Sequence, residues 1–273
     1  MARPRHGEDP LATDPDATMS RAERLHAISE AVITAGSVRI EDLPESFGVS
    51  LMTIHRDLDH LAAQGLLRKT RGLVTALGSS LAESSTEYRA RLNTTAKRTL
   101  ARAAVELVEP GQVLILDDST TGLHLADLLP ERQPLTVMTN FQPMLDALVG
   151  NPDLNLISLG GQYYPWCRAY MGSLTVDALA NVRADLLIMS TSAITDDVCF
   201  HQHHDTVLVK RAMFTAARRR VLYVDHSKFE QRALHALLPL REFDTVIVDA
   251  DTPAEHLERL EGQGIELVVA ARD

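Results

Sequence analysis

Cysteine, aromatic residues and long hydrophobic runs are all scarce in this sequence. Two cysteines, Cys167 and Cys199, are too few for a disulfide scaffold or a four-thiolate zinc site, so we expect a cytoplasmic chain. No apolar run approaches the ~18 residues of a transmembrane helix, which argues against a membrane protein. The N-terminal stretch MARPRHGEDPLATDPDA has no apolar core and is not expected to be a secretory signal.

Positive charge is also in short supply. The chain has 27 Lys and Arg against 37 Asp and Glu, a net charge of −10, which taken alone argues against nucleic acid as a partner. Residues 20–75 are nevertheless neutral, because basic and acidic residues are equal in number there. A nucleic-acid-binding surface in this part of the chain would therefore have to be a local basic patch.

The sequence does contain enough apolar residues, 45% of the chain, to build a globular core. Residues 1–19 carry proline and charge without periodicity and are expected to be disordered. Residues 20–75 have helical spacing, residues 76–85 (ALGSSLAESS) have the composition of a linker, and residues 86–273 have the pattern of a larger α/β domain. We therefore expect two folded domains of unequal size.

The smaller domain, residues 20–75, has the pattern of a winged helix-turn-helix. Ser20 and Glu23 form a capping box that starts the first helix, and Gly36 ends it. The expected elements are helices over 20–35, 41–47 and 50–64 and a β-hairpin over 66–76.

The third helix and the hairpin offer polar and basic groups that could contact DNA. Ile54, Leu58 and Leu61 take the inner face of the helix. Hydroxyl groups at a helix start bind phosphate, and arginine reaches guanine edges or phosphates. The candidate DNA-binding residues are Ser50, Met52, Thr53, His55, Arg56, Arg68, Lys69 and Arg71. A solvated polar helix beside an ordinary basic turn, or a winged helix that binds a protein, would show the same pattern.

From residue 113 onward, short apolar runs alternate with helical stretches. Runs that are apolar almost throughout are typical of strands buried on both faces, and their alternation with helices predicts a mostly parallel, Rossmann-like sheet. The strands are expected over 113–117, 135–139, 154–159, 185–190, 221–225, 245–249 and 265–270, after one long helix over 86–109.

Polar residues cluster where these strands end, which is where open parallel sheets bind ligands. Hydroxyl groups, backbone N–H groups and lysines suit a phosphate, and carboxylate and amide groups suit sugar hydroxyls. The candidate effector-binding residues are Asp117, Ser119, Thr120, Thr121, Asn140, Gly160, Gly161, Lys210 at the start of a helix, Asp225 and Lys228. Each residue type is also common in turns and caps, so a purely structural role is the alternative.

Residues 199–205 (CFHQHHD) concentrate side chains of the zinc-ligand type. The ligands on offer are Cys199, His201, His203, His204 and Asp205. Consecutive residues on an extended segment point in several directions, so two at most would converge. We therefore expect no metal and no other cofactor, and favour hydrogen bonds to a ligand or a contact between subunits.

Several motifs resemble the DeoR family of bacterial transcriptional regulators. GVSLMTIHRDLDHLAAQGLLRKTRG is similar to the family's helix-turn-helix and wing, and LDDSTTGLHLADLL, VKRAM and DHSKFEQRAL are similar to motifs of its C-terminal domain. The resemblance implies a DNA-binding domain followed by an effector-sensing and oligomerisation domain that resembles ribose-5-phosphate isomerase. It further implies a homo-oligomer, dimer or tetramer, that represses carbohydrate-metabolism genes and leaves its double-stranded DNA operator when it binds a phosphorylated sugar or related metabolite.

Some positions depart from the family pattern. His55 stands where the family usually has an arginine, and Arg71 replaces a usual His or Gly of the wing. Ser119 and Gly122 replace a Gly and a Thr of the phosphate loop. The operator and the effector can therefore differ from those of typical members.

An enzyme, a sugar-phosphate isomerase with an added domain, is the alternative. Asp117 or Asp225 would serve as its general base. No matching acid–base set accompanies them, and an enzyme gives the winged helix no role. We therefore expect a regulator without catalytic residues.

Overall fold

A computed structural model describes residues 19, 21–35, 37–63, 67–76 and 86–272. The chain divides into two compact units, Met1–Ala76 and Leu77–Asp273, called here the N-terminal unit and the C-terminal unit. The predicted linker, apart from Ala76 at the end of the hairpin, and almost all of the predicted tail lie outside the described residues.

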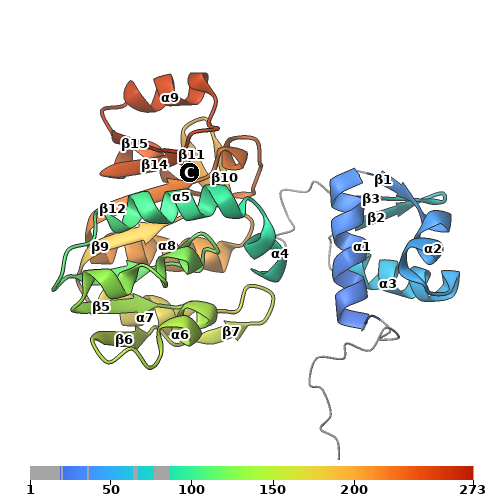
Figure 1. Ribbon diagram of the computed structural model, residues 1–273, viewed down its shortest axis with the longest axis horizontal. Helices are drawn as coiled ribbons and strands as arrows, with labels where there is room; N and C mark the ends of the chain where they lie inside the picture. Colours follow the sequence, from blue (N-terminus) through green and yellow to red (C-terminus); the bar gives the residue numbers. More distant parts are fainter. Residues whose placement is uncertain (1–18, 20, 36, 64–66, 77–85, 273) are drawn as a thin grey trace, which may run out of the picture. The chain divides into compact units, whose positions relative to one another are not determined.

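The N-terminal unit is a winged helix-turn-helix (Figure 1). Its helices are α1 (Arg21–Ala35), the 3₁₀ helix η1 (Ile40–Asp42), α2 (Leu43–Phe47) and α3 (Leu51–Ala63). Its strands are β1 (Ser37–Arg39), β2 (Leu67–Thr70) and β3 (Leu73–Ala76), paired antiparallel in the order β1-β3-β2. Gly48, at φ 62°, ends α2 in the left-handed region that glycine adopts without strain. The sequence analysis did not predict β1.

The C-terminal unit is built on a parallel sheet of seven strands, which confirms the predicted fold class (Figure 1). The strands are β4 (Val113–Leu116), β5 (Leu135–Thr139), β6 (Leu154–Ser158), β9 (Ala184–Met189), β12 (Ala217–Val224), β14 (Thr245–Asp249) and β15 (Glu266–Ala270). Their order is β15-β14-β12-β9-β4-β5-β6, and every neighbouring pair is parallel.

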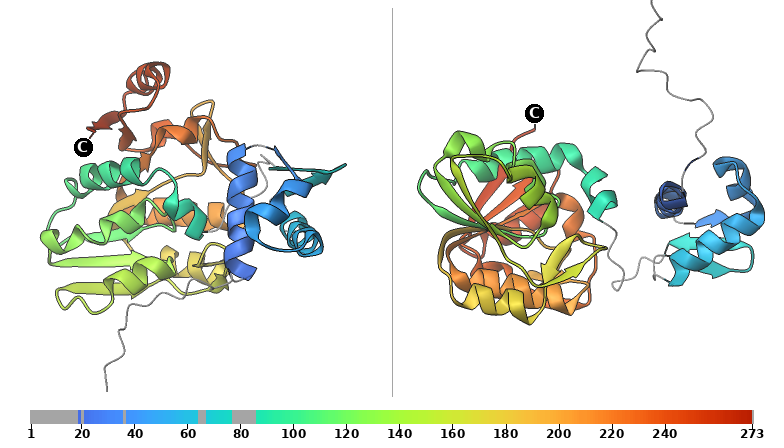
Figure 2. Two further views of the ribbon diagram at one scale, coloured as in Figure 1. Left: turned by 45° about the vertical axis from the view of Figure 1, so that its right-hand side comes forward. Right: turned by 90° about the horizontal axis from the view of Figure 1, so that it is seen from below.

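Helices cover both faces of this sheet, as Figure 2 shows. On one face lie α5 (Thr94–Val105) and α6 (Gln142–Leu148), and on the other lie α7 (Ser173–Ala180) and α8 (His204–Ala216). The remaining elements are α4 (Thr86–Arg91), α9 (Ala254–Glu261), the 3₁₀ helices η2 (Gly122–Leu125), η3 (Leu129–Arg132), η4 (His226–Phe229) and η5 (Leu240–Glu242), the hairpin β7 (Gln162–Tyr164) and β8 (Ala169–Met171), and the small sheet of β10 (Ala193–Thr195), β11 (Val198–His201) and β13 (His235–Pro239).

The single helix expected over 86–109 was a wrong prediction. The chain forms α4 and α5 there, with Asn93 between them at φ 51°. Asparagine tolerates this left-handed conformation better than most residues. The turn lets the Asn93 amide donate hydrogen bonds to Asp225 Oδ1 at 2.9 Å and Ser227 Oγ at 3.3 Å. The break therefore ties the start of α5 to the carboxyl end of β12.

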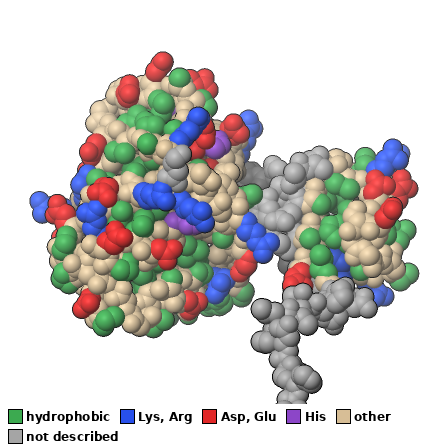
Figure 3. Space-filling view, viewed as in Figure 1, with side chains coloured by type: hydrophobic (Ala, Val, Ile, Leu, Met, Phe, Trp, Pro, Cys, Tyr) green, Lys and Arg blue, Asp and Glu red, His purple; other side chains and the backbone are tan. Residues whose placement is uncertain are grey.

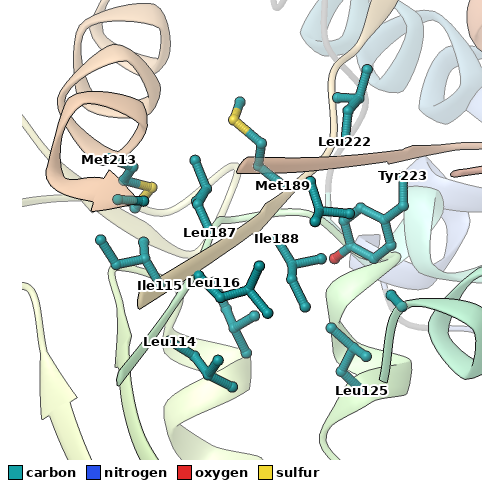
Figure 4. Close-up of a cluster of buried hydrophobic side chains, with 14 of the residues drawn as sticks. Leu114, Ile115, Leu116, Leu125, Leu187, Ile188, Met189, Met213, Leu222 and Tyr223 are labelled. Atoms are coloured by element: carbon teal, nitrogen blue, oxygen red, sulfur yellow. The ribbon is translucent and has the colours of Figure 1, made fainter. Parts of the chain in front are cut away.

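The core of the C-terminal unit lies between the sheet and its helices (Figure 4). Leu116 of β4, Ile188 of β9 and Leu222 of β12 are fully buried there. Tyr223 is buried among them, and its hydroxyl lies 3.0 Å from Ser119 Oγ in the loop after β4. The core thus sets the position of that loop.

None of the described helices has both the length and the apolar character needed to cross a membrane.

Candidate effector site and DNA-binding surface

The order of the strands places β4 and β9 at a switch point of the sheet. From β4 the chain continues to β5 and β6 on one side, whereas β9, β12, β14 and β15 lie on the other side. Open parallel sheets bind ligands at the carboxyl ends of the strands beside such a point. The loop 117–121 after β4 and the residues 190–192 after β9 occupy this position, and both are buried.

A buried ion cluster holds these two segments together. The ammonium of Lys210 contacts Asp117 and lies 3.1 Å from Asp118 Oδ1 and 3.2 Å from the Ser190 carbonyl oxygen. Asp117 accepts hydrogen bonds from the backbone N–H groups of Ser119 at 3.2 Å and Ser190 at 2.8 Å. Sequence reasoning missed Asp118 and Ser190, although the second aspartate follows directly on a predicted site residue.

The electrostatics of the cluster favour the charged forms of Lys210 and Asp118. Burial opposes the charge on Lys210, but Asp117 and Asp118 outweigh it and raise the pKa of the ammonium above its ordinary value. Burial likewise opposes the charge on Asp118, and the Lys210 ammonium lowers the pKa of that carboxyl below its ordinary range. Lys210 lies inside α8, which begins at His204, so the prediction that it opens a helix was wrong. Its place among two carboxylates suits it to hold the loop 117–121 in position.

The loop 117–121 leads directly into a short 3₁₀ helix, η2. Ser119 Oγ accepts a hydrogen bond from the backbone N–H of Gly122 at 3.1 Å. Thr120 and Thr121 are buried at the carboxyl end of β4. The Lys97 ammonium of α5 donates to Thr120 Oγ1 at 3.0 Å, which places a cation beside the predicted phosphate loop.

Lys97 is a candidate site residue that sequence reasoning missed. Its side chain is 4% exposed, and burial and the Lys228 charge lower its pKa to about 7, although Asp225 opposes the shift. The sequence feature that could have identified Lys97 is its position in the helical stripe of α5 that otherwise carries Leu100, Ala101 and Ala104. A lysine in an apolar stripe indicates a buried partner or a ligand.

Three buried side-chain oxygen atoms among the described residues accept no hydrogen bond. Two of them, Asn140 Oδ1 and Asp225 Oδ2, belong to predicted site residues, and the third is Gln202 Oε1. Asn140 donates through its amide nitrogen to the Tyr170 carbonyl oxygen at 2.8 Å, which fixes the orientation of the side chain. Asp225 accepts from Ser227 and Asn93 through its other oxygen, Oδ1. Burial would raise the pKa of Asp225, but the Lys228 ammonium and these hydrogen bonds lower it. Buried acceptors of this kind are costly unless a donor reaches them.

Gly160 and Gly161 follow β6, and their backbone lies against the start of α7. The Thr175 hydroxyl donates to the Gly160 carbonyl oxygen at 2.7 Å. Gly161 has φ 149°, and a Cβ atom there would lie 2.2 Å from Thr175 Oγ1 and 2.6 Å from the Met171 carbonyl oxygen. Position 161 therefore requires glycine.

Gly161→Ala is expected to lower the free energy of unfolding of the C-terminal unit by about 1–3 kcal/mol, since it adds backbone strain and a steric clash. Trp166, the only tryptophan in the chain, lies in this unit, so its fluorescence during urea unfolding measures the change. Gly160→Ala is the matched control, because a Cβ atom at Gly160 would meet no atom within 4 Å. Equal stability of the two variants would contradict the prediction.

Among the described residues, the histidine-rich segment 199–205 contributes no side chain to a three-ligand group that could hold a metal ion. His203 stacks on Trp166 with ring centroids 4.2 Å apart, and His204 contacts the His235 ring. Asp205 Oδ2 accepts a hydrogen bond from the Tyr164 hydroxyl at 2.6 Å. His201 and Cys199 are buried, and burial raises the pKa of the Cys199 thiol to about 12.

Among the described residues, one other group could hold a metal ion: His226, Asp249 and Asp251, whose ligand atoms lie within 4.8 Å of one another. Asp249 already accepts hydrogen bonds from the backbone N–H of His226 at 2.7 Å and the Thr252 hydroxyl at 3.1 Å. The Arg272 guanidinium pairs with Asp251. These contacts account for the group as a hydrogen-bonded network.

In the N-terminal unit, α3 presents the predicted DNA-binding residues. Met52 is 66% exposed, and His55 and Arg56 are exposed beside it. Ser50 Oγ accepts a hydrogen bond from the Thr53 N–H at 3.2 Å, so the serine caps the helix.

The hairpin exposes Arg68 and Arg71, whereas Lys69 pairs with Asp59 of α3 at 2.6 Å. Asp57, on the opposite face of α3, is buried and pairs with Arg24 at 2.7 Å and Arg21 at 3.4 Å. These ion pairs fix α1 against α3, which leaves the exposed face of α3 and the hairpin available to a partner.

Comparison with known proteins identifies both units. The model of the DeoR-like helix-turn-helix domain matches residues 24–79, and that of the DeoR C-terminal sensor domain matches residues 92–250. The chain belongs to the DeoR family. It is accordingly a DNA-binding transcriptional regulator with a sensor domain, as the motifs predicted.

Relatives match this DeoR-family chain over nearly their whole length. The glycerol-3-phosphate regulon repressor of Escherichia coli K12 is 32% identical over 251 residues, 91% of this chain and 99% of the relative. An uncharacterized HTH-type transcriptional regulator of the same strain is 34% identical and covers 93% of this chain and 100% of its own. The L-fucose operon activator of Haemophilus influenzae is 32% identical over 84% of this chain and 92% of its own.

Solved structures give a weaker likeness. Ribose 5-phosphate isomerase A from Methanocaldococcus jannaschii aligns with TM-score 0.36 at 18% identity, over 50% of this chain and 55% of that one. This similarity is too low to assign a fold, which rests on the sheet itself.

Proposed function

We propose that this DeoR-family regulator is a repressor of carbohydrate-metabolism genes whose sensor domain binds a small phosphorylated sugar or a related metabolite. The observation that carries the effector class is the pair of buried acceptors, Asn140 Oδ1 and Asp225 Oδ2, at the carboxyl ends of β5 and β12. Acceptors without donors match the hydroxyl groups of a sugar.

The phosphate group of the effector binds, in this proposal, at the loop 117–121. Thr120 and Thr121 supply hydroxyl groups, and Lys97 and Lys228 supply positive charge. Figure 3 shows Lys and Arg side chains over the α5 region of the C-terminal unit, and Arg98 and Arg102 of that helix are exposed. Such a field would attract an anion toward the site.

Operator DNA, in this proposal, binds the exposed face of α3 and the hairpin. Arg56 and its neighbours on α3 would enter the major groove, and Arg68 and Arg71 would contact the flanking phosphates. One such domain binds weakly, so we propose a homo-oligomer that reads a two-fold symmetric operator in the cytoplasm.

We further propose that the chain is not an enzyme. Asp117 is engaged by Lys210 and two backbone N–H groups, and Asp225 is engaged by Ser227 and Asn93. These partners occupy Asp117, and the pKa of Asp225 is lowered, so neither carboxylate is suited to be a general base that must accept a proton.

An operator selected from random duplex DNA at low salt tests the proposal. Labelled operator is expected to bind the full chain and to be released by one member of a panel of pentose, hexose and glycerol phosphates, without turnover of that compound. The matching dephosphorylated compounds serve as controls. Failure of the chain to bind DNA at low salt, or catalytic conversion of a sugar phosphate by the chain, would contradict the proposal.

A further inference from the structure

Helix α4 is held near its end by Lys97, a residue of the proposed effector site. At its start, the Thr86 N–H donates to the Trp166 carbonyl oxygen at 3.2 Å, and Thr86 is buried. Near its end, the Lys97 ammonium donates to the Arg89 carbonyl oxygen. The position of α4 therefore depends on a side chain that also contacts the loop 117–121.

Lys97 is the point at which the two contacts meet. Its ammonium donates to Thr120 Oγ1 at 3.0 Å and to the carbonyl oxygen of Arg89. Both are neutral acceptors, although the ammonium is almost fully buried. A phosphate beside Thr120 would offer this ammonium a charged acceptor, and hydrogen bonds to charged groups are about twice as strong as neutral ones.

The turn between α4 and α5 also lies beside the proposed effector site. The Asn93 amide donates to Asp225 Oδ1, while Asp225 Oδ2 accepts no hydrogen bond among the described residues. A sugar hydroxyl that binds Asp225 would thus lie next to the junction that joins the two helices. In the sequence, α4 is the first helix after residues 77–85, which join the sensor domain to the winged helix.

We propose that Lys97 binds the anionic group of the effector and that this contact withdraws its ammonium from the Arg89 carbonyl, which releases the end of α4. The inference rests on the proposed effector site and adds to it a coupling residue and a moving element. Effector binding then changes the helix that leads, along the chain, to the DNA-binding domain.

The charges around Lys97 give this contact a pH dependence. Lys228 of η4 and Arg89 of α4 are cations facing it, Asp225 at the end of β12 is the anion, and His124 of η2 is a neighbouring titratable group. The pKa of Lys97 without effector is about 7, and a bound anion would raise it. Binding therefore takes up a proton above pH 7, and affinity falls as the pH rises beyond 7 toward the pKa of the complex.

Three substitutions in the chain test the coupling: Lys97→Met, Lys97→Arg and, as a control, Arg241→Met at an exposed position of η5. Inorganic phosphate and glycerol 3-phosphate are the probes, titrated at pH 7.5 in two buffers of different ionisation enthalpy. Amide hydrogen exchange of residues 86–91 measures the release of α4. Circular dichroism checks that each variant is folded, which is expected because Lys97→Met removes a buried charge.

The wild-type chain and Arg241→Met are expected to take up protons with the probe and to show faster exchange in α4 when it binds. Lys97→Met is expected to bind the probe about 10- to 100-fold more weakly, without proton uptake, and to show fast α4 exchange even alone. Lys97→Arg should retain binding but lose the pH dependence above pH 7.

Two results would overturn the inference. One leaves the proposed effector class intact, and the other contradicts the proposed effector site as well. If Lys97→Met keeps the proton uptake and the phosphate-dependent exchange of α4, the coupling is wrong while the effector class stands. If the wild-type chain binds operator but neither probe nor any sugar phosphate, the proposed effector site fails and the coupling with it.

Discussion

Arg56→Ala is expected to reduce specific operator affinity about 10- to 100-fold for each half-site, so that an oligomer bound to a two-fold operator falls to its non-specific level. Arg56 is exposed on α3, and truncation removes a side chain that can form paired hydrogen bonds to a guanine edge. Titration of labelled operator with excess unrelated competitor DNA measures the loss.

Arg241→Ala is the matched control for this experiment. Arg241 is an exposed arginine of the C-terminal unit, so its removal changes the net charge equally without touching α3. It should lower operator affinity little and without sequence preference. An Arg56→Ala variant whose specific affinity equals that of Arg241→Ala would refute the role of α3 in reading the operator.

Asp117→Asn is expected to destabilise the C-terminal unit by about 3–5 kcal/mol, the usual cost of breaking a buried ion pair by removing one partner. The amide cannot accept from Lys210, Ser190 and Ser119 as the carboxylate does, and it leaves the buried ammonium with Asp118 alone. Effector response should be lost with it, because the loop 117–121 is no longer held.

Urea unfolding followed through Trp166 fluorescence measures this effect in the unit concerned. Asp127→Asn, at an exposed position after η2, removes the same charge from the surface and should shift the transition by less than about 0.5 kcal/mol. Similar transitions for the two variants would show that the Lys210 cluster contributes nothing to stability.

The architecture was predictable from the sequence because its signals are local and repeated. Each strand of the large sheet is a short apolar run between helical stretches. In the winged helix, capping residues in the sequence mark the starts of α1 and α3. The family motifs then added the order of the domains. The strand β1 was not predicted because its three residues, Ser37–Arg39, become extended only by pairing with β3.

The details of the site depend on contacts between segments far apart in the chain, which no local pattern encodes. Asn93 breaks the predicted helix because its side chain meets Asp225, 132 positions later. Lys210 is neutralised by Asp117, 93 positions earlier, so its motif predicted a site residue but not its partners. The place of Lys97 in an apolar stripe indicates a buried partner, but only the fold shows that this partner is Thr120.

The pairing of Lys210 with two aspartates has an evolutionary consequence. Because Lys210 is already held by two carboxylates inside the protein, the groups left to distinguish one metabolite from another are those around it, such as Lys97, Asn140 and Asp225. Substitutions among them can retune the chemical preference of the pocket without dismantling the framework that positions the loop. A lineage of regulators could in this way acquire new inducers while inheriting one unchanged scaffold.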